Sequence, residues 1–595
     1  MSKHAQLLEG PIGPALARLA IPMGLGIIFI IALNLADTYF VSMLGTAELA
    51  AMSFTFPVVS LVVSVVMGVG IGTTSALARE IGAGDEQAIR RLATHSIMLA
   101  VLLVIVVSGV GLVTQDLVFT LLGAEPELLP LLREYMTVWF LGAIFLVVPM
   151  TGMSAIRATG DTQTPMFIMM AAAIANIALD PVFIFGWGPV PAMGLRGAAI
   201  ATLVSRSITL VLGLWVLRRE DLLDLHWPSM AELRRSWWSI LSVGLPAAIT
   251  NALTPVATAV LTWLIAQHGT EAVAAYGVGS RVESLLLIAP LALGSALTPF
   301  IGQNWGAHHN ERVARGIVLA RNFSVAWGAG AWVVLALGGN HLADVFTDDP
   351  HVVDLVYQYL WIVPLSYGAN GLVSVASAAF NAVDKAVRST VLSALRSLGL
   401  AIPLAAAGSA VMGLRGIFIG IAVATVLSAG LAYLWMRSLT EPDRRGKALH
   451  LEGASPAVDA ALQALIGGVD DLPDIDVHAT RQRALGFFVG ERELGHVHHR
   501  GQLDMAFPPE VRDQLVREGK VEHHRVVHDS CWVTHRLEQE GDVPEAIWLL
   551  HLAHALLRLA REPGPAEEEL SHLDLSAGLR ESIDHAHARW LASAA

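Results

Sequence analysis

The sequence predicts an all-α polytopic membrane protein with twelve transmembrane helices in two six-helix lobes, followed by a C-terminal soluble α+β domain. Of its 595 residues, 54% are hydrophobic and only 15% are charged, whereas soluble domains average about 25% charged residues. Apolar stretches recur from Pro14 to Leu439 and then stop. Each stretch is long enough to cross a hydrocarbon core of roughly 30 Å as a helix. An internal repeat divides the spans between the two lobes.

The repeat appears in matching segments that lie about 220 residues apart. Thr46-Ala-Glu-Leu-Ala-Ala51 is matched by Thr270-Glu-Ala-Val-Ala-Ala275, and Gly194-Leu-Arg-Gly197 recurs as Gly413-Leu-Arg-Gly416. Because each copy has an even number of spans, both copies have the same orientation and the repeat is parallel. Transporters built this way bind substrate between the halves and alternate access by rocking them.

These patterns divide the chain into four segments. We expect an N-terminal lobe over 1–225, a C-terminal lobe over 226–440, a polar linker over 441–456 and a soluble domain over 457–595. The soluble segment is long enough for a core of its own. It also carries most of the net charge of −13, and this acidity argues against nucleic-acid binding.

Loop charges predict the orientation in the bilayer. The loops after spans 1, 7 and 9 hold essentially no lysine or arginine, whereas the loops after spans 2, 6 and 8 are basic. By the positive-inside rule the basic loops are cytoplasmic, so both termini are expected in the cytoplasm. We therefore expect a multi-pass monomer in the inner (cytoplasmic) membrane. The basic loop residues are Arg79, Arg90, Arg91, Arg218, Arg219, Arg234, Arg235, Arg312, Arg315 and Arg321.

Polar side chains at membrane depth mark a candidate ion-coupling site. Asp37 lies in the first span, while Asn176 and Asp180 lie four residues apart on one face of the fifth. A carboxylate there costs about 2.5–3.5 kcal/mol on insertion scales, so it usually faces a cavity or a partner. Thr202, in the sixth span, could add a hydroxyl oxygen. These groups suit either Na⁺ or a proton relay. The alternative is that each acid is neutral or paired with a basic group and only fixes helix packing.

Three further residues are secondary candidates. Pro22 precedes Asp37 by about four helical turns and is either a static kink or a hinge. Glu283 begins an apolar span of the second half and is a candidate for a direct role in coupling. Arg281 lies two residues before it, and the two could form an interfacial pair, although such neighbours do not face each other on a helix.

Several motifs resemble the multidrug and toxic compound extrusion (MATE) family. They are Asn34-Leu-Ala-Asp-Thr-Tyr-Phe-Val-Ser-Met-Leu-Gly45, Ala158-Thr-Gly-Asp161, Gly279-Ser-Arg-Val-Glu283 and Gly302-Gln-Asn-Trp-Gly-Ala307. The resemblance covers about residues 10–440. It implies an antiporter, and not an enzyme, that exports organic, often cationic, compounds in exchange for H⁺ or Na⁺. A lipid-linked precursor flippase of similar architecture is the alternative.

The resemblance is greatest to the DinF-like branch of that family. It implies that the critical acids lie on spans 1 and 5, which match Asp37 and Asp180, and that a first-span proline matching Pro22 bends the helix. Another branch uses acids in spans 7 and 10. Here span 7 (Leu241–Gln267) and the body of span 10 (Tyr357–Phe380) hold no acid, so coupling is expected in the N-terminal lobe alone. No cofactor besides the coupling ion is expected.

The tail resembles a small luciferase-like domain of unknown function. The resemblance rests on Glu493-Leu-Gly-His-Val-His498, Asp504-Met-Ala-Phe-Pro508 and Ser530-Cys-Trp-Val-Thr534. The tail is rich in histidine, but with only Cys531 present nothing resembles a closed structural zinc site. We therefore expect solvated surface histidines and no metal, with a ligand or metal sensor that regulates transport as the alternative. The histidines in question are His496, His498, His499, His523, His524 and His528.

Overall fold

The computed structural model describes residues 5–224, 226–344, 346, 349–440, 454–469, 472, 475–479, 484–489, 492–524, 530–559 and 563–594. The chain divides into two compact units, 1–441 and 442–595. Most of the predicted linker lies outside the described residues. Each unit is described by itself below.

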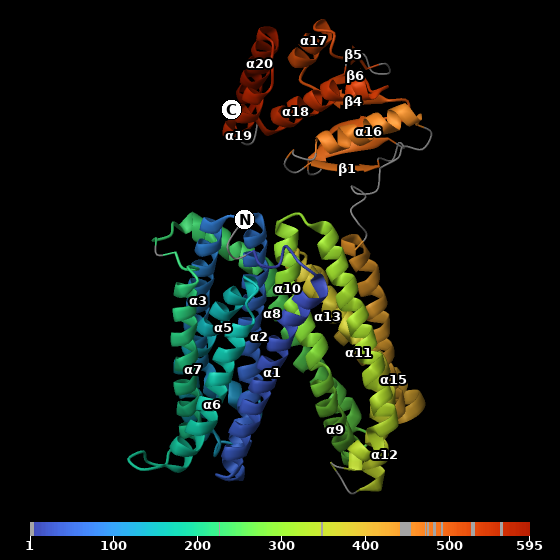
Figure 1. Ribbon diagram of the computed structural model, residues 1–595. Coiled ribbons are helices and arrows are strands. Elements are labelled where there is room, and N and C mark those ends of the chain that lie inside the picture. Colours follow the sequence, from blue (N-terminus) through green and yellow to red (C-terminus); the bar gives the residue numbers. More distant parts are fainter. Residues whose placement is uncertain are drawn as a thin grey trace. The chain divides into compact units, whose positions relative to one another are not determined.

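The described part of the first unit is built from helices and consists of two bundles that follow each other along the chain (Figure 1). The helices of the N-terminal lobe are α1 (Ile12–Ser42), α2 (Thr46–Ala83), α3 (Glu86–Leu121), α4 (Leu129–Gly142), α5 (Ile144–Ala158), α6 (Gln163–Phe185) and α7 (Gly194–Arg219). Those of the C-terminal lobe are α8 (Met230–Ala266), α9 (Thr270–Leu286), α10 (Ile288–Gly306), α11 (Asn310–Asp344), α12 (Pro350–Ile362), η1 (Val363–Ser366), α13 (Tyr367–Ala382), α14 (Ala386–Ala394), η2 (Leu395–Ala401) and α15 (Ile402–Thr440).

The described residues contain nine helical segments that are long and apolar enough to cross a membrane, and two bent helix pairs raise this number to eleven. The bent pairs are α4 with α5 and α9 with α10, each with an angle of 42°. The last segment, Ala386–Leu439, is 54 residues long. It leaves helical geometry at Gly413 (φ 62°, ψ −141°), and the backbone of Gly408 lies against that of Gly416. The segment thus folds back on itself and supplies two crossings, which agrees with the twelve predicted spans.

Local sequence chemistry fixes where these helices begin and end. α2 ends at Gly84, which adopts a left-handed conformation (φ 86°) that glycine tolerates without a steric penalty. Asp85 then caps α3, since its carboxylate accepts the backbone N–H of Ala88 at 2.9 Å. α8 begins with a capping box formed by Ser229 and Glu232.

Helix α1 joins the two lobes. In its first half, Leu16 and Leu19 belong to an apolar core made mostly of C-terminal-lobe residues. In its second half, Val41 belongs to a core of the N-terminal lobe. Pro22 lies between these two regions, so the helix changes lobes close to its proline.

The segment before α1 is anchored to both lobes. The side-chain oxygen of Gln303 on α10 accepts the backbone N–H of Leu7 at 3.1 Å, and its amide nitrogen donates to the carbonyl of Ala158 on α5 at 2.7 Å. The amide of Asn304 donates to the carbonyl of Leu7 at 3.1 Å. The N-terminal segment therefore belongs to the contact between the lobes.

The lobes meet at one end of the unit and diverge toward the other (Figure 1). Across α2 and α8, a Cβ on Gly72 would overlap the carbonyl oxygen of Ile240 and lie 3.0 Å from the nitrogen of Gly244. The hydroxyl of Ser75 donates to the carbonyl of Asn381 at 2.5 Å. Glycine therefore permits backbone-to-backbone packing where the lobes touch.

The second unit is an α+β domain, as predicted. Its six-stranded antiparallel sheet has the order β1-β2-β3-β4-β6-β5. Side chains such as Phe487, Leu503 and Leu550 form its apolar core. The strands are β1 (Ile475–Ala479), β2 (Leu485–Val489), β3 (Arg492–Val497), β4 (Gln502–Ala506), β5 (Glu522–His523) and β6 (Trp532–Arg536). The helices are α16 (Pro456–Gly468), α17 (Pro509–Arg517), η4 (Glu540–Asp542), α18 (Val543–Leu559), α19 (Pro563–His572) and α20 (Ala577–Ala594).

Candidate functional site

Helices α1 and α6 carry the two acids of the predicted site. The buried face of α6 includes Ala172, Ala173, Asn176 and Asp180, a spacing that follows the 3.6-residue period of the helix. Asn176 and Asp180 are completely buried, and Asp37 on α1 is 8% exposed. The sequence pattern therefore directs the polar side chains of α6 into the interior of the lobe.

Asn176 links the two helices α6 and α7. Its amide nitrogen donates to Asp180 Oδ1 at 3.3 Å and to Thr202 Oγ1 at 3.4 Å. Both distances exceed the usual 2.9–3.0 Å of a strong N–H···O bond, so the contacts are weak. Asp37 lies close enough to Asp180 for the two carboxylates to repel each other. The structure thus brings together all four residues of the predicted ion-coupling site.

Three buried oxygens of this cluster have no hydrogen-bond partner among the described residues: Asp37 Oδ1, Asn176 Oδ1 and Asp180 Oδ2. No basic side chain of the described part forms an ion pair with either acid. The alternative in which a basic group pairs with each acid therefore finds no such base among the described residues. An unsatisfied buried polar group costs about 1–3 kcal/mol, and a proton or an oxygen-seeking cation would relieve this cost.

Tyr135 on α4 belongs to the same region, although the sequence analysis did not identify it. It is buried and lies within electrostatic range of both Asp37 and Asp180. Its hydroxyl is a hydrogen-bond donor within an apolar helix, and this is the one sequence signal that could have drawn attention to it. Tyr135 therefore joins the candidate site as a neutral polar neighbour.

Pro22 interrupts the hydrogen bonding of α1 without breaking the helix. A proline at this position has no N–H for the carbonyl of Arg18, four residues earlier. That carbonyl instead accepts the hydroxyl of Thr162, at 3.5 Å, from the turn that precedes α6. α1 continues unbroken from Ile12 to Ser42. The hinge assigned to Pro22 stays a prediction, and the long Thr162 contact is the bond that bending would break.

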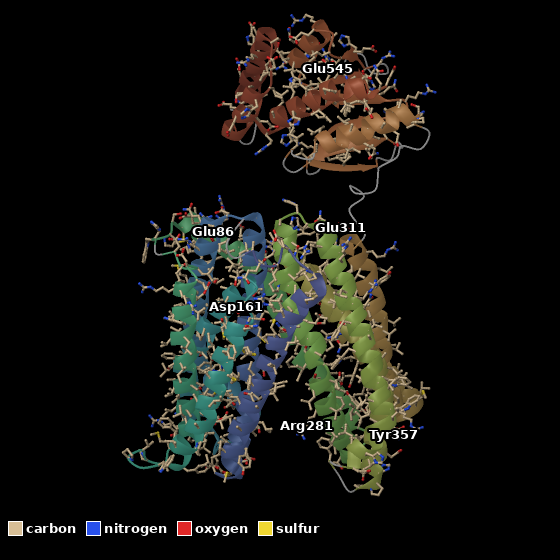
Figure 2. All side chains as sticks on the ribbon, in the orientation of Figure 1. Glu86, Asp161, Arg281, Glu311, Tyr357 and Glu545 are labelled. Carbon is tan, nitrogen blue, oxygen red and sulfur yellow. The ribbon has the colours of Figure 1, made fainter. Side chains whose placement is uncertain are left out.

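The secondary candidates Glu283 and Arg281 do not form an ion pair. Arg281 is exposed on α9 (Figure 2). The carboxylate of Glu283 instead accepts a hydrogen bond from the Tyr359 hydroxyl and lies within electrostatic range of Arg396. Arg396 in turn donates to Asn370 Oδ1 at 2.6 Å. Glu283 is thus part of a polar network inside the C-terminal lobe.

We expect Glu283→Gln to lower the free energy of unfolding by about 1–3 kcal/mol, because the carboxylate holds Tyr359 and faces Arg396. Thermal unfolding of the detergent-purified protein measures this change. Tyr359→Phe is the matched variant, since it removes the same hydrogen bond and leaves the charge in place. Loss of ion coupling at unchanged stability would instead make Glu283 a coupling acid.

The tail histidines fall into two groups. His499 and His523 are exposed, as predicted for solvated histidines. His496, His498 and His524 are instead largely shielded and surround Asp504. His528 lies outside the described residues.

Comparison with known families matches residues 22–182 and 246–407 to the MatE family and residues 491–553 to the Luciferase domain. The FAD transporter of Shewanella oneidensis is 37% identical over 443 residues, which cover 74% of this chain and 98% of that protein. The multidrug export protein MepA of Staphylococcus aureus is 25% identical over 433 residues, covering 72% of this chain and 94% of the relative. The crystal structure of the Vibrio cholerae MATE transporter VcmN in the bent form has a TM-score of 0.69 at 27% identity, covering 73% of this chain and 98% of that chain.

Proposed function

Since this chain belongs to the MatE family of multidrug and toxic compound extrusion transporters, we propose that it is a secondary antiporter that exports organic compounds in exchange for H⁺ or Na⁺. Asp37 and Asp180 carry the coupling ion in this proposal, and Asn176 and Thr202 add neutral oxygens. The observation that supports it best is the group of three buried oxygens without partners. A coupling ion bound there would neutralise two carboxylates that otherwise repel each other.

The contact between the lobes supports alternating access. It lies at the end where Arg79 donates to the carbonyl of Ala382 and Arg312 donates to the carbonyl of Leu7, and the charge rule assigns these basic residues to the cytoplasm. With that orientation the lobes are closed toward the cytoplasm and separated toward the outside. Rocking of the lobes about α1 would then open the cytoplasmic end and expose the transport path to the other side.

Reconstituted transport under separately imposed gradients tests this function. The purified protein is placed in liposomes, and substrate movement is followed under a pH gradient alone, a Na⁺ gradient alone, and neither. We expect movement against the substrate gradient under one of the two ion gradients. Equal rates under all three conditions would contradict antiport and leave only facilitated diffusion.

The substrate class is the second part of the proposal. The FAD transporter of Shewanella oneidensis is a relative over nearly its whole length, which favours a flavin dinucleotide beside the cationic compounds expected from the sequence. Arg281 is an exposed positive side chain of α9 and could attract a diphosphate. Uptake of FAD and of a cationic dye, each measured directly in the same liposomes under the driving ion gradient, distinguishes the two classes, because only a transported compound accumulates.

We expect Pro22→Ala to slow transport by about tenfold, which corresponds to about 1.4 kcal/mol. The new N–H can donate to the Arg18 carbonyl, so the helix gains a backbone hydrogen bond and becomes harder to bend. Initial rates in liposomes measure the effect, with binding of the coupling ion measured in parallel. Pro57→Ala is the matched control, since Pro57 also lies inside a helix of this lobe but is exposed. A wild-type rate in Pro22→Ala would show that the proline is a static kink.

A further inference from the structure

Three imidazole rings in the tail converge on one carboxylate oxygen. The Nε2 atoms of His496, His498 and His524 lie 3.8, 3.4 and 3.6 Å from Asp504 Oδ2. His496 lies on β3 and His498 in the turn after it. Asp504 lies on β4, and His524 directly follows β5. The possible ligand atoms of His496, His498 and Asp504 all lie within 4.8 Å of one another, and His524 approaches the same carboxylate oxygen from a segment that is distant in sequence.

The strand register explains how this cluster forms. His496 pairs with Asp504 between β3 and β4, and Asp504 pairs with Thr534 between β4 and β6. Leu503 and Met505, on either side of Asp504, belong to the apolar core, so Asp504 points to the opposite face of the sheet. The three paired residues therefore form a polar row on that face, and His498 extends it.

The neighbours of the cluster hold its ligand atoms in place. Asp504 is 4% exposed, and its Oδ1 accepts the Thr534 hydroxyl at 2.5 Å, which leaves Oδ2 directed at the imidazoles. The Nδ1 atom of His496 lies 2.6 Å from Glu493 Oε1. A carboxylate bound to one ring nitrogen fixes the tautomer and frees the other nitrogen, which is the usual arrangement behind a metal-bound histidine.

We propose that His496, His498, His524 and Asp504 form a binding site for a divalent transition-metal ion of the Zn²⁺ type. Ligands placed about 2.0–2.1 Å from a tetrahedral centre lie about 3.3–3.4 Å from one another. The observed distances of 3.4–3.8 Å from the three Nε2 atoms to Asp504 Oδ2 are close to that value. The ligand atoms of His496, His498 and Asp504 also all lie within 4.8 Å of one another. Three imidazoles with one carboxylate suit Zn²⁺, whereas Mg²⁺ and Ca²⁺ favour sites made of oxygen alone.

A simple charge pair explains less of the geometry. One imidazolium would be enough to neutralise Asp504, and it would need no carboxylate behind its other nitrogen. Here three Nε2 atoms face the same oxygen and one ring is oriented by Glu493. The cluster lies within the residues matched by the Luciferase domain, so a metal would provide that domain with a ligand-binding centre of its own.

Metal binding by the full-length protein tests the site. The protein is purified with a tag that contains no histidine, stripped with a chelator, titrated with Zn²⁺ and assayed for bound metal by mass spectrometry. We expect one Zn²⁺ per chain, and substitution by Co²⁺ should give the visible absorption of a four-coordinate site. His498→Ala and Asp504→Asn should each weaken binding by more than about 100-fold, and Glu493→Gln by about 10–100-fold.

His499→Ala and His523→Ala are the matched controls, because both residues are exposed histidines next to the cluster in sequence. They should bind Zn²⁺ as the wild type does. Absence of stoichiometric Zn²⁺ from the reloaded wild-type protein would overturn the proposal, whatever the folding of the variants. Undiminished binding in both His498→Ala and Asp504→Asn would overturn it as well.

Discussion

Replacing Asp180 by asparagine is expected to reduce ion-driven transport by about 100-fold, close to the background of empty liposomes, while the protein still folds and inserts. The amide fills nearly the same volume but cannot carry the charge that a bound ion neutralises. A loss of this size lies within the range of typical coupling free energies, about 1–3 kcal/mol. The measurement is the initial rate of substrate movement under the ion gradient that drives the wild-type protein.

Asp37→Asn should give the same loss, because both carboxylates face one site. The double variant should be no worse than either single variant, since residues that act as one unit are not additive. Asp161→Asn is the matched control. Asp161 is also an acid at the start of α6, where it accepts the backbone N–H groups of Gln163 and Thr164 at 3.0 Å, and asparagine caps a helix equally well. Gradient-driven transport by the double variant would refute the proposed coupling site.

Gly72→Leu is expected to force the lobes apart at their contact and to block transport. A side chain there would overlap the backbone of α8, at the carbonyl of Ile240 and at Gly244. Overpacking of this kind costs about 1–3 kcal/mol or more, which changes the ratio of the closed and open forms by about 5- to 150-fold. We therefore expect a protein that rests with this end open.

Spin labels can measure that opening. The only cysteine is Cys531, so a Cys531→Ser background leaves no other reactive thiol. Gln87→Cys and Glu311→Cys then place one label on each lobe, in the first turns of α3 and α11. The distance between the labels should increase in Gly72→Leu. It should stay unchanged in Gly109→Leu, because a side chain at Gly109 on α3 meets no atom within 4 Å. An unchanged distance with full transport in Gly72→Leu would show that the contact is not needed.

The sequence predicted which polar side chains of the N-terminal lobe lie close together, because this signal is local. Asn176 and Asp180 lie one helical turn apart in an apolar span, and such a pair is conspicuous without any knowledge of neighbouring helices. Tyr135 could not be found this way, since its proximity to the acids depends on how α4 packs. For the same reason His496, His498 and His524 were predicted to be solvated. Their convergence on Asp504 follows from strand pairing and from His524, which directly follows β5 and is distant in sequence.

The span count shows a similar limit. Composition alone indicated twelve crossings, but it could not show that the last two form one helical segment that turns at Gly413. Nor could it show that α1 would pack on both lobes. That arrangement depends on where Leu16 and Leu19 find apolar neighbours, and these neighbours come from spans encoded much later in the chain.

The anchoring of Leu7 by Gln303 has a consequence for how the protein is made. The two residues are separated by 296 positions, and ribosomes add about 5–20 residues per second, so the N-terminal segment waits about 15–60 s for its acceptor to be synthesised. During that interval Leu16 and Leu19 face lipid instead of α10. Exposure of these leucines to lipid does not destabilise the helix, because a leucine is as stable among acyl chains as among other leucines. Helix α1 is thus synthesised well before the helices of the C-terminal lobe against which its first half packs.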